Sequence, residues 1–154
     1  MNLIVGVGLP HFLFVVLIAS MPASADRDQW VEMQRIESGM LVRVEFSGKL
    51  IGILHRDERM IDVLRAKYGE TETDNSNSAL ASIYRSVKPT YFVFYDKSPS
   101  SKCHLTYVRE GWNAGLIDSC TGHKYDFSGR SNFGQALEIP EYTFISETKI
   151  VFDE

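Results

Sequence analysis

Cysteine is scarce in this chain, with only two among 154 residues. Two cysteines cannot build the multi-bridge framework of small secreted domains, but they can form one disulfide or supply half of a metal site. A basic surface is also missing, because the formal net charge is −4 and acids and bases are interspersed along the chain. We therefore expect no binding to nucleic acid.

Common catalytic signatures are absent as well. The sequence has no Ser/His/Asp constellation, no glycine-rich phosphate loop and no pair of carboxylates at a spacing that suggests acid–base catalysis. It also has no internal repeats. With 44% hydrophobic residues, the chain is long enough for one domain with its own core plus a terminal segment.

The terminal segment is an apolar run over residues 3–21 that contains no Asp, Glu, Lys or Arg. Its length is close to the roughly 20 residues of a bilayer span, so we expect it to meet the membrane. It is either a retained anchor or a signal peptide, since residues 23–25 (Ala-Ser-Ala) have the pattern of a cleavage site. The missing basic residues and the long run favour the anchor, and Gly8 and Pro10 argue against a buried core helix. Either membrane outcome places the domain outside the cytoplasm, where disulfides form.

Apolar periodicity predicts a hairpin followed by a short helix. Residues 41–46 alternate between apolar and polar, residues 47–49 (Ser-Gly-Lys) are a turn, and residues 50–55 form the return strand. Asp57 is then a candidate N-cap and Gly69 a candidate helix end. The apolar residues that share one face of this helix are Met60, Ile61, Leu64 and Tyr68.

The remaining chain is expected to form loops and short strands. The acidic stretch 70–78 suits an exposed loop, and a short helical turn is expected over residues 80–84. The aromatic run 91–95 predicts a buried strand, and residues 97–102 predict a loop. Further strands are expected over residues 136–139, 142–145 and 149–152. Many short strands with little helix indicate a mainly β fold, a small antiparallel sandwich or barrel.

Separated motifs, in order along the chain, resemble one family. They are residues 21–26 (MPASAD), the hairpin 41–56, Lys88-Pro89 before the aromatic strand, His104-Leu105, residues 125–130 (YDFSGR) and the ending 137–151. Together they make the chain similar to the Rieske iron–sulfur subunit of ubiquinol–cytochrome c reductase, the bc1 complex. The resemblance implies a Rieske-type β domain with two cluster-binding loops at one tip. It divides the chain into an anchor or signal segment (1–25), a hinge or tether (26–40) and a Rieske-like domain (41–154).

The first cluster-binding loop departs from the family's pattern. In the family, a Cys-x-His loop and a Cys-x-x-His loop each give a thiolate to one iron and an imidazole to the other. Here Cys103 and His104 are adjacent, so in an extended loop their side chains point to opposite sides. Such a pair does not easily reach two irons of one cluster.

The second loop fits the family in two incompatible registers. Counting from His104, Cys120 and His123 take the ligand positions. Counting back from Tyr125 instead places Asp118 and Thr121 there. That second register leaves His104 as the one matched ligand of the chain.

Departures around the loops favour the second register. Tyr107 stands where the family has one half of an extra cysteine pair, and the third loop has Gly134-Gln135 in place of Gly-Pro. A shielded cluster depends on such surroundings as well as on its ligands. The resemblance therefore implies a degenerate site, in which Cys103 and Cys120 form a disulfide that replaces the cluster as cross-brace. A zinc site of two Cys and two His is allowed by residue type, but its spacing is poor.

Other residues of this region have two interpretations. Tyr125 matches a tyrosine that, in the family, donates its hydroxyl to a cluster sulfur, or it simply packs in the sheet. His104 and His123 are cluster ligands or surface loop histidines. Trp112 is expected to anchor a turn.

Three functional hypotheses result. The leading one is a module without a cofactor, anchored in the cytoplasmic membrane with its domain on the outer side. It would be accessory or structural in a respiratory complex and not catalytic alone, with cytochrome b- and c1-type subunits as candidate partners. The alternative is a 2Fe–2S carrier of electrons from ubiquinol to cytochrome c, with Cys103, His104, Cys120 and His123 as ligands. The third, favoured only if residues 1–25 are cleaved, is an exported binding domain unrelated to electron transfer.

Overall fold

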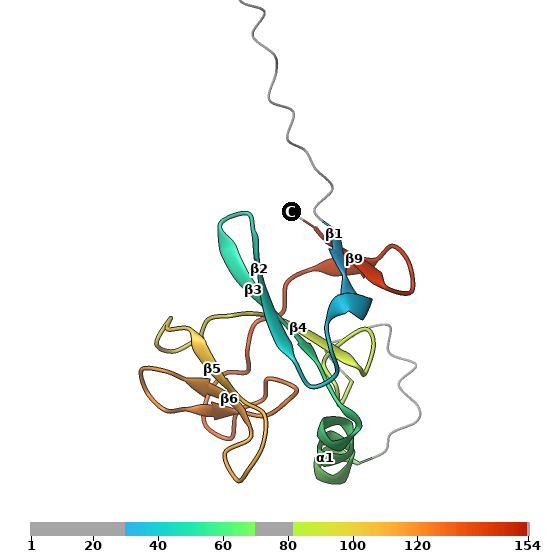
Figure 1. Cartoon of the computed structure of the whole chain (residues 1–154). Coiled ribbons are helices and arrows are strands. Elements are labelled where there is room, and N and C mark those ends of the chain that lie inside the picture. The colour runs from blue at the N-terminus through green and yellow to red at the C-terminus, as the bar shows by residue number, and fades with distance from the viewer. Residues whose placement is uncertain (1–29, 70–81, 154) are drawn as a thin grey trace, which may run out of the picture.

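The computed structural model describes residues 30–69 and 82–153. The elements, in chain order, are β1 (Trp30–Glu32), the 3-10 helix η1 (Met33–Arg35), β2 (Leu41–Phe46), β3 (Lys49–His55), α1 (Glu58–Tyr68), β4 (Tyr91–Tyr95), β5 (Leu105–Val108), β6 (Gly115–Asp118), β7 (Lys124–Tyr125), β8 (Tyr142–Phe144) and β9 (Lys149–Phe152). The mainly β fold with one short α-helix that the sequence predicts is confirmed (Figure 1). The apolar segment 3–21 and the acidic loop 70–78 lie outside the described residues. Within the described part of the chain, no helix has the length and apolar character needed to cross a membrane.

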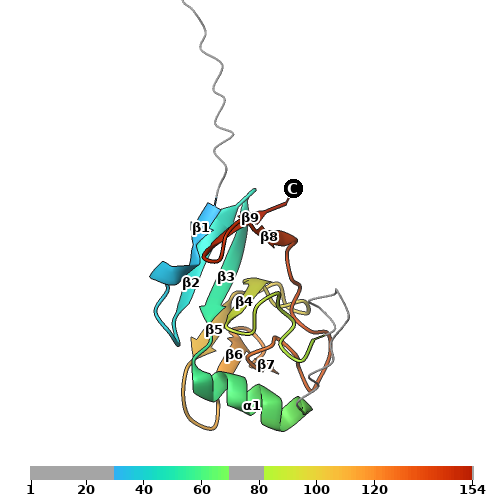
Figure 2. The ribbon, with the colours of Figure 1, turned by 90° about the vertical axis from the view of Figure 1, so that its right-hand side faces the viewer.

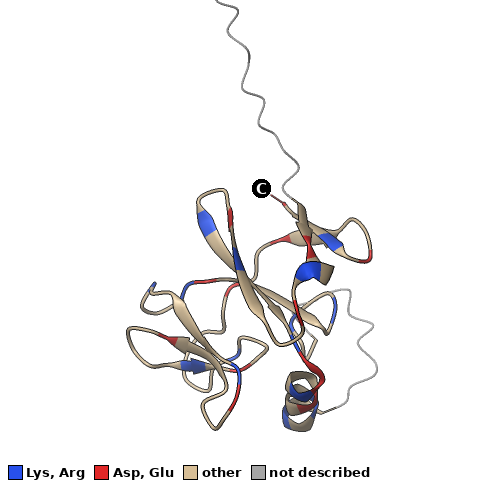
Figure 3. Ribbon diagram, in the orientation of Figure 1, with Lys and Arg blue, Asp and Glu red and all other residues tan. Residues whose placement is uncertain are grey.

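The strands form three antiparallel sheets of three strands each, in the orders β1-β9-β8, β2-β3-β4 and β5-β6-β7. The first sheet joins the two ends of the described chain, because Trp30 of β1 lies opposite Val151 of β9. Figure 1 accordingly shows the C-terminus beside β1. Figure 2 shows α1 at the other end of the domain. Acidic and basic residues are intermixed over the sheets, as expected from the sequence (Figure 3).

The hairpin and helix follow the sequence pattern closely. Strands β2 and β3 pair from Leu41 opposite Leu54 to Phe46 opposite Lys49. The Asp57 carboxylate caps α1 by accepting the Met60 backbone N–H at 3.0 Å. Both predicted segments are therefore confirmed.

The central sheet, β2-β3-β4, separates two apolar clusters. Side chains alternate across a strand, so Ile51 and Ile53 face one cluster while Leu54 faces the other. Helix α1 covers the second cluster with Met60 and Leu64, both fully buried. The two clusters thus give the small domain a core on both faces of one sheet.

Glycine is required at one point of this sheet. A Cβ at Gly52 would lie 2.5 Å from the ring of Phe94, which is opposite in β4. The aromatic strand, confirmed as β4, packs its rings against the space that Gly52 leaves open. We attribute the glycine to this close approach.

Two predicted elements are corrected by the structure. Residues 136–139 form no strand, because only single backbone hydrogen bonds hold them, from Leu137 N–H to Gly129 O and from Tyr95 N–H to Glu138 O. Of the helical turn expected over residues 80–84, residues 80 and 81 lie outside the described residues, and residues 82–84 form a bend and a turn.

The expected tether over residues 26–40 is structured in its described part. Residues 30–32 pair with β9, and η1 follows. Met33 and Ile36 are buried in the cluster beneath the central sheet. The burial of these apolar side chains stabilises the contact between this stretch and the domain, because removing apolar surface from water is favourable.

Candidate functional site

Two loops that follow neighbouring strands form the candidate site. The first loop, residues 96–104, connects β4 to β5, and the second loop, residues 119–123, connects β6 to β7. Strands β5 and β6 pair with Leu105 opposite Asp118, so the end of the first loop lies beside the start of the second. The Asp118 N–H donates to His123 O at 2.8 Å and closes the second loop.

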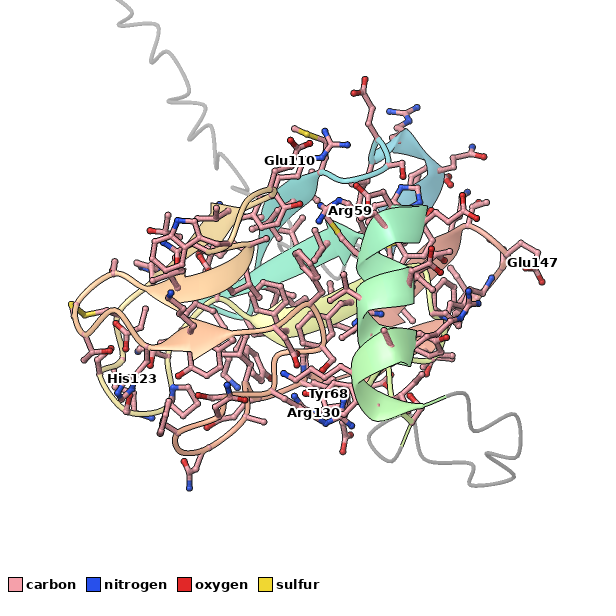
Figure 4. All side chains as sticks on the ribbon, turned by 90° about the horizontal axis from the view of Figure 1, so that it is seen from below. Arg59, Tyr68, Glu110, His123, Arg130 and Glu147 are labelled. Carbon is pink, nitrogen blue, oxygen red and sulfur yellow. A yellow bond between two sulfur atoms is a disulfide. The ribbon has the colours of Figure 1, made fainter. Side chains whose placement is uncertain are left out.

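A disulfide between Cys103 and Cys120 joins the two loops, with 6.1 Å between their Cα atoms. Cys103 is half-buried and Cys120 is exposed. Figure 4 shows this bond at the same end of the domain as His123. A second link runs from Ser119, whose hydroxyl donates to His104 O at 2.8 Å.

Asp118 is a third link between the loops. Its carboxylate is buried and accepts the Ser101 hydroxyl at 2.7 Å from the first loop. From the second loop it accepts the Cys120 N–H at 2.8 Å and the Thr121 N–H at 3.2 Å. Burial raises the pKa of Asp118, but hydrogen bonds from the hydroxyls of Ser101, Ser98 and Thr121 and from the Cys120 N–H hold the pKa well below its usual range.

Acid is expected to destabilise the domain through Asp118. Because the pKa of Asp118 is lower in the folded state, the unfolded chain takes up the proton first as the pH falls. The contribution is therefore fully present above the unfolded pKa of about 3.9 and is lost below it. Asp118→Asn should lower the unfolding free energy by about 2 kcal/mol at pH 7 and flatten its decline below about pH 4.

Urea denaturation at a series of pH values measures both effects. Asp62→Asn is the matched control, since Asp62 lies exposed on α1 and pairs with the exposed Arg65 at 3.3 Å. An unchanged pH profile in Asp118→Asn would contradict this role.

His104 is oriented by Asp96 and not by the cysteines. Its Nδ1 lies 2.9 Å from Asp96 O, and since a carbonyl oxygen only accepts, Nδ1 carries the proton. The Asp96 carboxylate is buried, accepts Arg43 Nε–H at 2.7 Å and receives the Leu105 N–H at 3.3 Å. The His104 ring itself is 70% exposed.

The predicted ligands do not converge on one centre. Within the described residues, the potential ligand atoms that lie within 4.8 Å of one another come from Cys103, Asp118 and Cys120, and neither His104 nor His123 joins them. Both sulfurs are bonded to each other, which leaves no free thiolate in the described chain. In this arrangement the residues do not fit a Rieske 2Fe–2S cluster, which needs two thiolates and two imidazoles.

Tyr125 packs in the core and contacts the first loop. Its side chain is 3% exposed, and its hydroxyl lies 3.1 Å from the Ser98 hydroxyl. The Tyr125 hydroxyl thus has a hydrogen-bond partner within this chain, and either hydroxyl can be the donor. Trp112, expected to anchor a turn, is instead 89% exposed beside Lys124.

The motif that follows Tyr125 is a structural clamp on α1. Asp126 accepts the Ser128 hydroxyl at 2.6 Å, the Tyr68 hydroxyl at 2.5 Å and the Lys67 ammonium at 2.9 Å. The Arg130 guanidinium lies 4.8 Å from the centre of the Tyr68 ring, and Figure 4 shows the two side chains together. These contacts hold the end of α1 against the segment that follows β7.

Sequence reasoning missed the polar residues that organise the first loop. They are Arg43, Asp96, Ser98 and Ser101. Arg43 is a polar residue of the alternating strand 41–46, and its partner Asp96 is 53 residues away. No local pattern marks such a pair, although an Asp directly after a buried strand is a weak signal.

Comparison with known proteins places the chain among one group of relatives. No family model matches it. The "Ubiquinol-cytochrome c reductase iron-sulfur subunit" of Bradyrhizobium diazoefficiens is 31% identical over 123 residues, which are 78% of this chain and 68% of that protein. The protein of the same name from Allochromatium vinosum is 25% identical over 98% of this chain and 84% of its own length. The "Cytochrome b-c1 complex subunit Rieske-1, mitochondrial" of Arabidopsis thaliana is 30% identical over 92% of this chain and 53% of its own.

A solved structure supports the same fold. A chain of "Hyperthermophilic respiratory Complex III" superposes with a TM-score of 0.55 over 89% of this chain and 83% of its own length. The two sequences are 14% identical, so this likeness concerns the fold alone.

Proposed function

Because the chain belongs to the family of Rieske iron–sulfur subunits of ubiquinol–cytochrome c reductase, we propose that it is an accessory module of a respiratory electron-transfer complex. The module has kept the family's fold and lost the 2Fe–2S cluster. It acts by binding and bracing partners, since without a cluster it has no electron carrier of its own.

One observation carries the proposal, namely the pairing of the only two cysteines in the chain. A Rieske centre needs two thiolates, and a disulfide consumes both. The two states exclude each other in a chain without a third cysteine. The disulfide also suits the proposed location, because disulfides form and persist outside the cytoplasm.

The links between the loops also support the proposal, because they connect the two loops without a cluster. In the family the cluster joins the two loops. Here the disulfide, the Ser101–Asp118 hydrogen bond and the Ser119–His104 hydrogen bond do so. The register that aligns Asp118 with a ligand cysteine puts a hydrogen-bonded carboxylate where a thiolate would bind iron.

The proposal includes the layout of the chain. Residues 1–25 are a retained anchor in the cytoplasmic membrane, residues 26–40 lead away from it, and residues 41–154 form the module on the outer side. The apolar run 3–21 and the family supply the support for this layout. Cytochrome b- and c1-type subunits are the proposed partners, because the relatives are named as subunits of that complex.

Iron and acid-labile sulfide per chain test the proposal. The full chain is expressed with a cluster-assembly system beside the Bradyrhizobium relative as positive control. We expect no iron in this chain and about two irons and two sulfides in a relative that carries the cluster. Intact mass should show Cys103 and Cys120 oxidised to each other and residues 1–25 retained.

The opposite result is equally distinct. About two irons and two sulfides, with a Rieske-type EPR signal after reduction, would establish the electron carrier. Cys103, His104, Cys120 and His123 would then be its ligands. An intact mass that corresponds to a chain without residues 1–25 would show that the segment is cleaved, and the module would then be exported and not anchored in the membrane.

A further inference from the structure

An open groove lies beside the first loop. It has a volume of about 440 Å³ and runs between the β2–β3 turn, the end of β4 and residues 97–104. Its floor is partly apolar, with Leu50, Tyr95 and Pro99. Binding pockets in proteins cover a similar range of volume, so the groove has room for more than one side chain of a partner.

Three lysines line this groove: Lys49, Lys97 and Lys102. All three are exposed, and none has a carboxylate within ion-pair distance in the described part of the chain. Of the two acids that line the groove, Asp96 is buried against Arg43, which leaves only Glu138 exposed. A chain with a net charge of −4 therefore gathers three lysines without carboxylate partners in one groove, and one of them, Lys49, lies over the Tyr95 ring at 5.1 Å.

Lys102 adopts an unfavourable backbone conformation for a lysine. Its φ is 64°, in the left-handed region that asparagine and glycine tolerate better. Two backbone hydrogen bonds hold it there, from Lys102 N–H to Ser98 O at 3.0 Å and from Ser98 N–H to Cys103 O at 2.8 Å. Strained residues cluster at binding sites, where the side chain has a use that offsets the strain.

The groove lacks the fixed donors of a small-molecule anion site. Such sites present buried, convergent polar groups. Here the buried polar groups are already paired, Asp96 with Arg43 and Ser98 with Tyr125. The positive charges are on long, exposed lysine side chains, which suits a protein contact formed by charge complementarity.

We propose that this groove docks an acidic segment of a partner protein, with Asp or Glu carboxylates meeting Lys49, Lys97 and Lys102. The methylene groups of glutamates pack on the apolar floor. The inference deepens the proposed function by naming the chemistry of a partner. Iron content tests the proposed loss of the cluster, whereas peptide binding tests the docking of an acidic segment. Either proposal can therefore fail without the other.

Fluorescence anisotropy of a labelled hexaglutamate peptide tests the docking. The full chain, in detergent micelles at low salt, should bind the peptide, and Lys49→Gln with Lys97→Gln should weaken binding by about tenfold. Lys149→Gln removes the same type of charge from β9 and should change the affinity by less than about twofold. Equal losses in the groove variants and in Lys149→Gln would overturn the proposal, because they would reflect net charge alone.

Lys102→Asn separates binding from folding. Asparagine suits φ of 64°, so the melting temperature should hold or rise while peptide affinity falls by about threefold. Citrate should compete only weakly. An unchanged affinity in Lys102→Asn and in the double variant, or binding of citrate without binding of the peptide, would sink the proposal.

Discussion

Arg56→Met is expected to lower the free energy of unfolding by about 3–5 kcal/mol. The Arg56 side chain is 1% exposed and donates four hydrogen bonds. Its acceptors are Phe127 O, Ser86 Oγ, Pro89 O and Tyr84 O. Methionine fills a similar space but leaves these acceptors without a donor, and buried unsatisfied groups are costly. Burial lowers the pKa of Arg56 to about 9, so it stays charged at neutral pH.

Urea denaturation at pH 7 measures this loss, with Arg59→Gln as the control. Arg59 lies on the first turn of α1 and its exposed guanidinium donates to Arg109 O at 2.6 Å. We expect its replacement to lower the unfolding free energy by less than about 1 kcal/mol. A loss below about 1 kcal/mol in Arg56→Met would show that the loops it joins do not depend on it.

Loss of the disulfide is expected to lower the unfolding free energy by about 3 kcal/mol. Cys103 and Cys120 are 17 residues apart, and a bridge across a loop of that length restricts the unfolded chain by about this amount. The double variant Cys103→Ser, Cys120→Ser removes the bridge without adding bulk. Denaturation of the oxidised wild type and of this variant gives the difference.

Dithiothreitol supplies the internal control. It should shift the denaturation midpoint of the wild type toward that of the double variant and leave the variant unchanged. Mass spectrometry shows whether dithiothreitol has reduced the disulfide of the wild type. If the reduced wild type keeps its denaturation midpoint, the disulfide does not stabilise the domain.

Two sets of contacts outside the two loops also stabilise the domain. Arg56, between β3 and α1, joins the segment before β4 to Phe127 after β7. Asp126 joins the end of α1 to that same segment after β7. Neither contact needs a metal. Residues 125–130 (YDFSGR) therefore have a structural role that does not depend on a cluster. This role gives a physical reason for the motif in a chain whose ligand motifs depart from those of the family.

Local patterns predicted the elements whose cause is local. The alternation in residues 41–46 and the capping residues Asp57 and Gly69 are readable because strands and helices have different side-chain periods. Strand β4 was predicted from its composition instead, because aromatic residues are enriched in strands. The strand predicted over residues 136–139 was wrong. β propensity does not distinguish a paired strand from an extended connection, and here the neighbouring segments form only single backbone hydrogen bonds with these residues.

The sequence by itself determined the hairpin, the helix and, through an ordered set of motifs, the family. Only the tertiary structure decided that the ends of the described chain pair as β1 and β9, that Arg43 meets Asp96, and that the Asp118 carboxylate accepts the Ser101 hydroxyl of the first loop. Each of these contacts joins residues far apart in the chain. Their formation depends on how the sheets pack, and no short stretch of sequence carries that information.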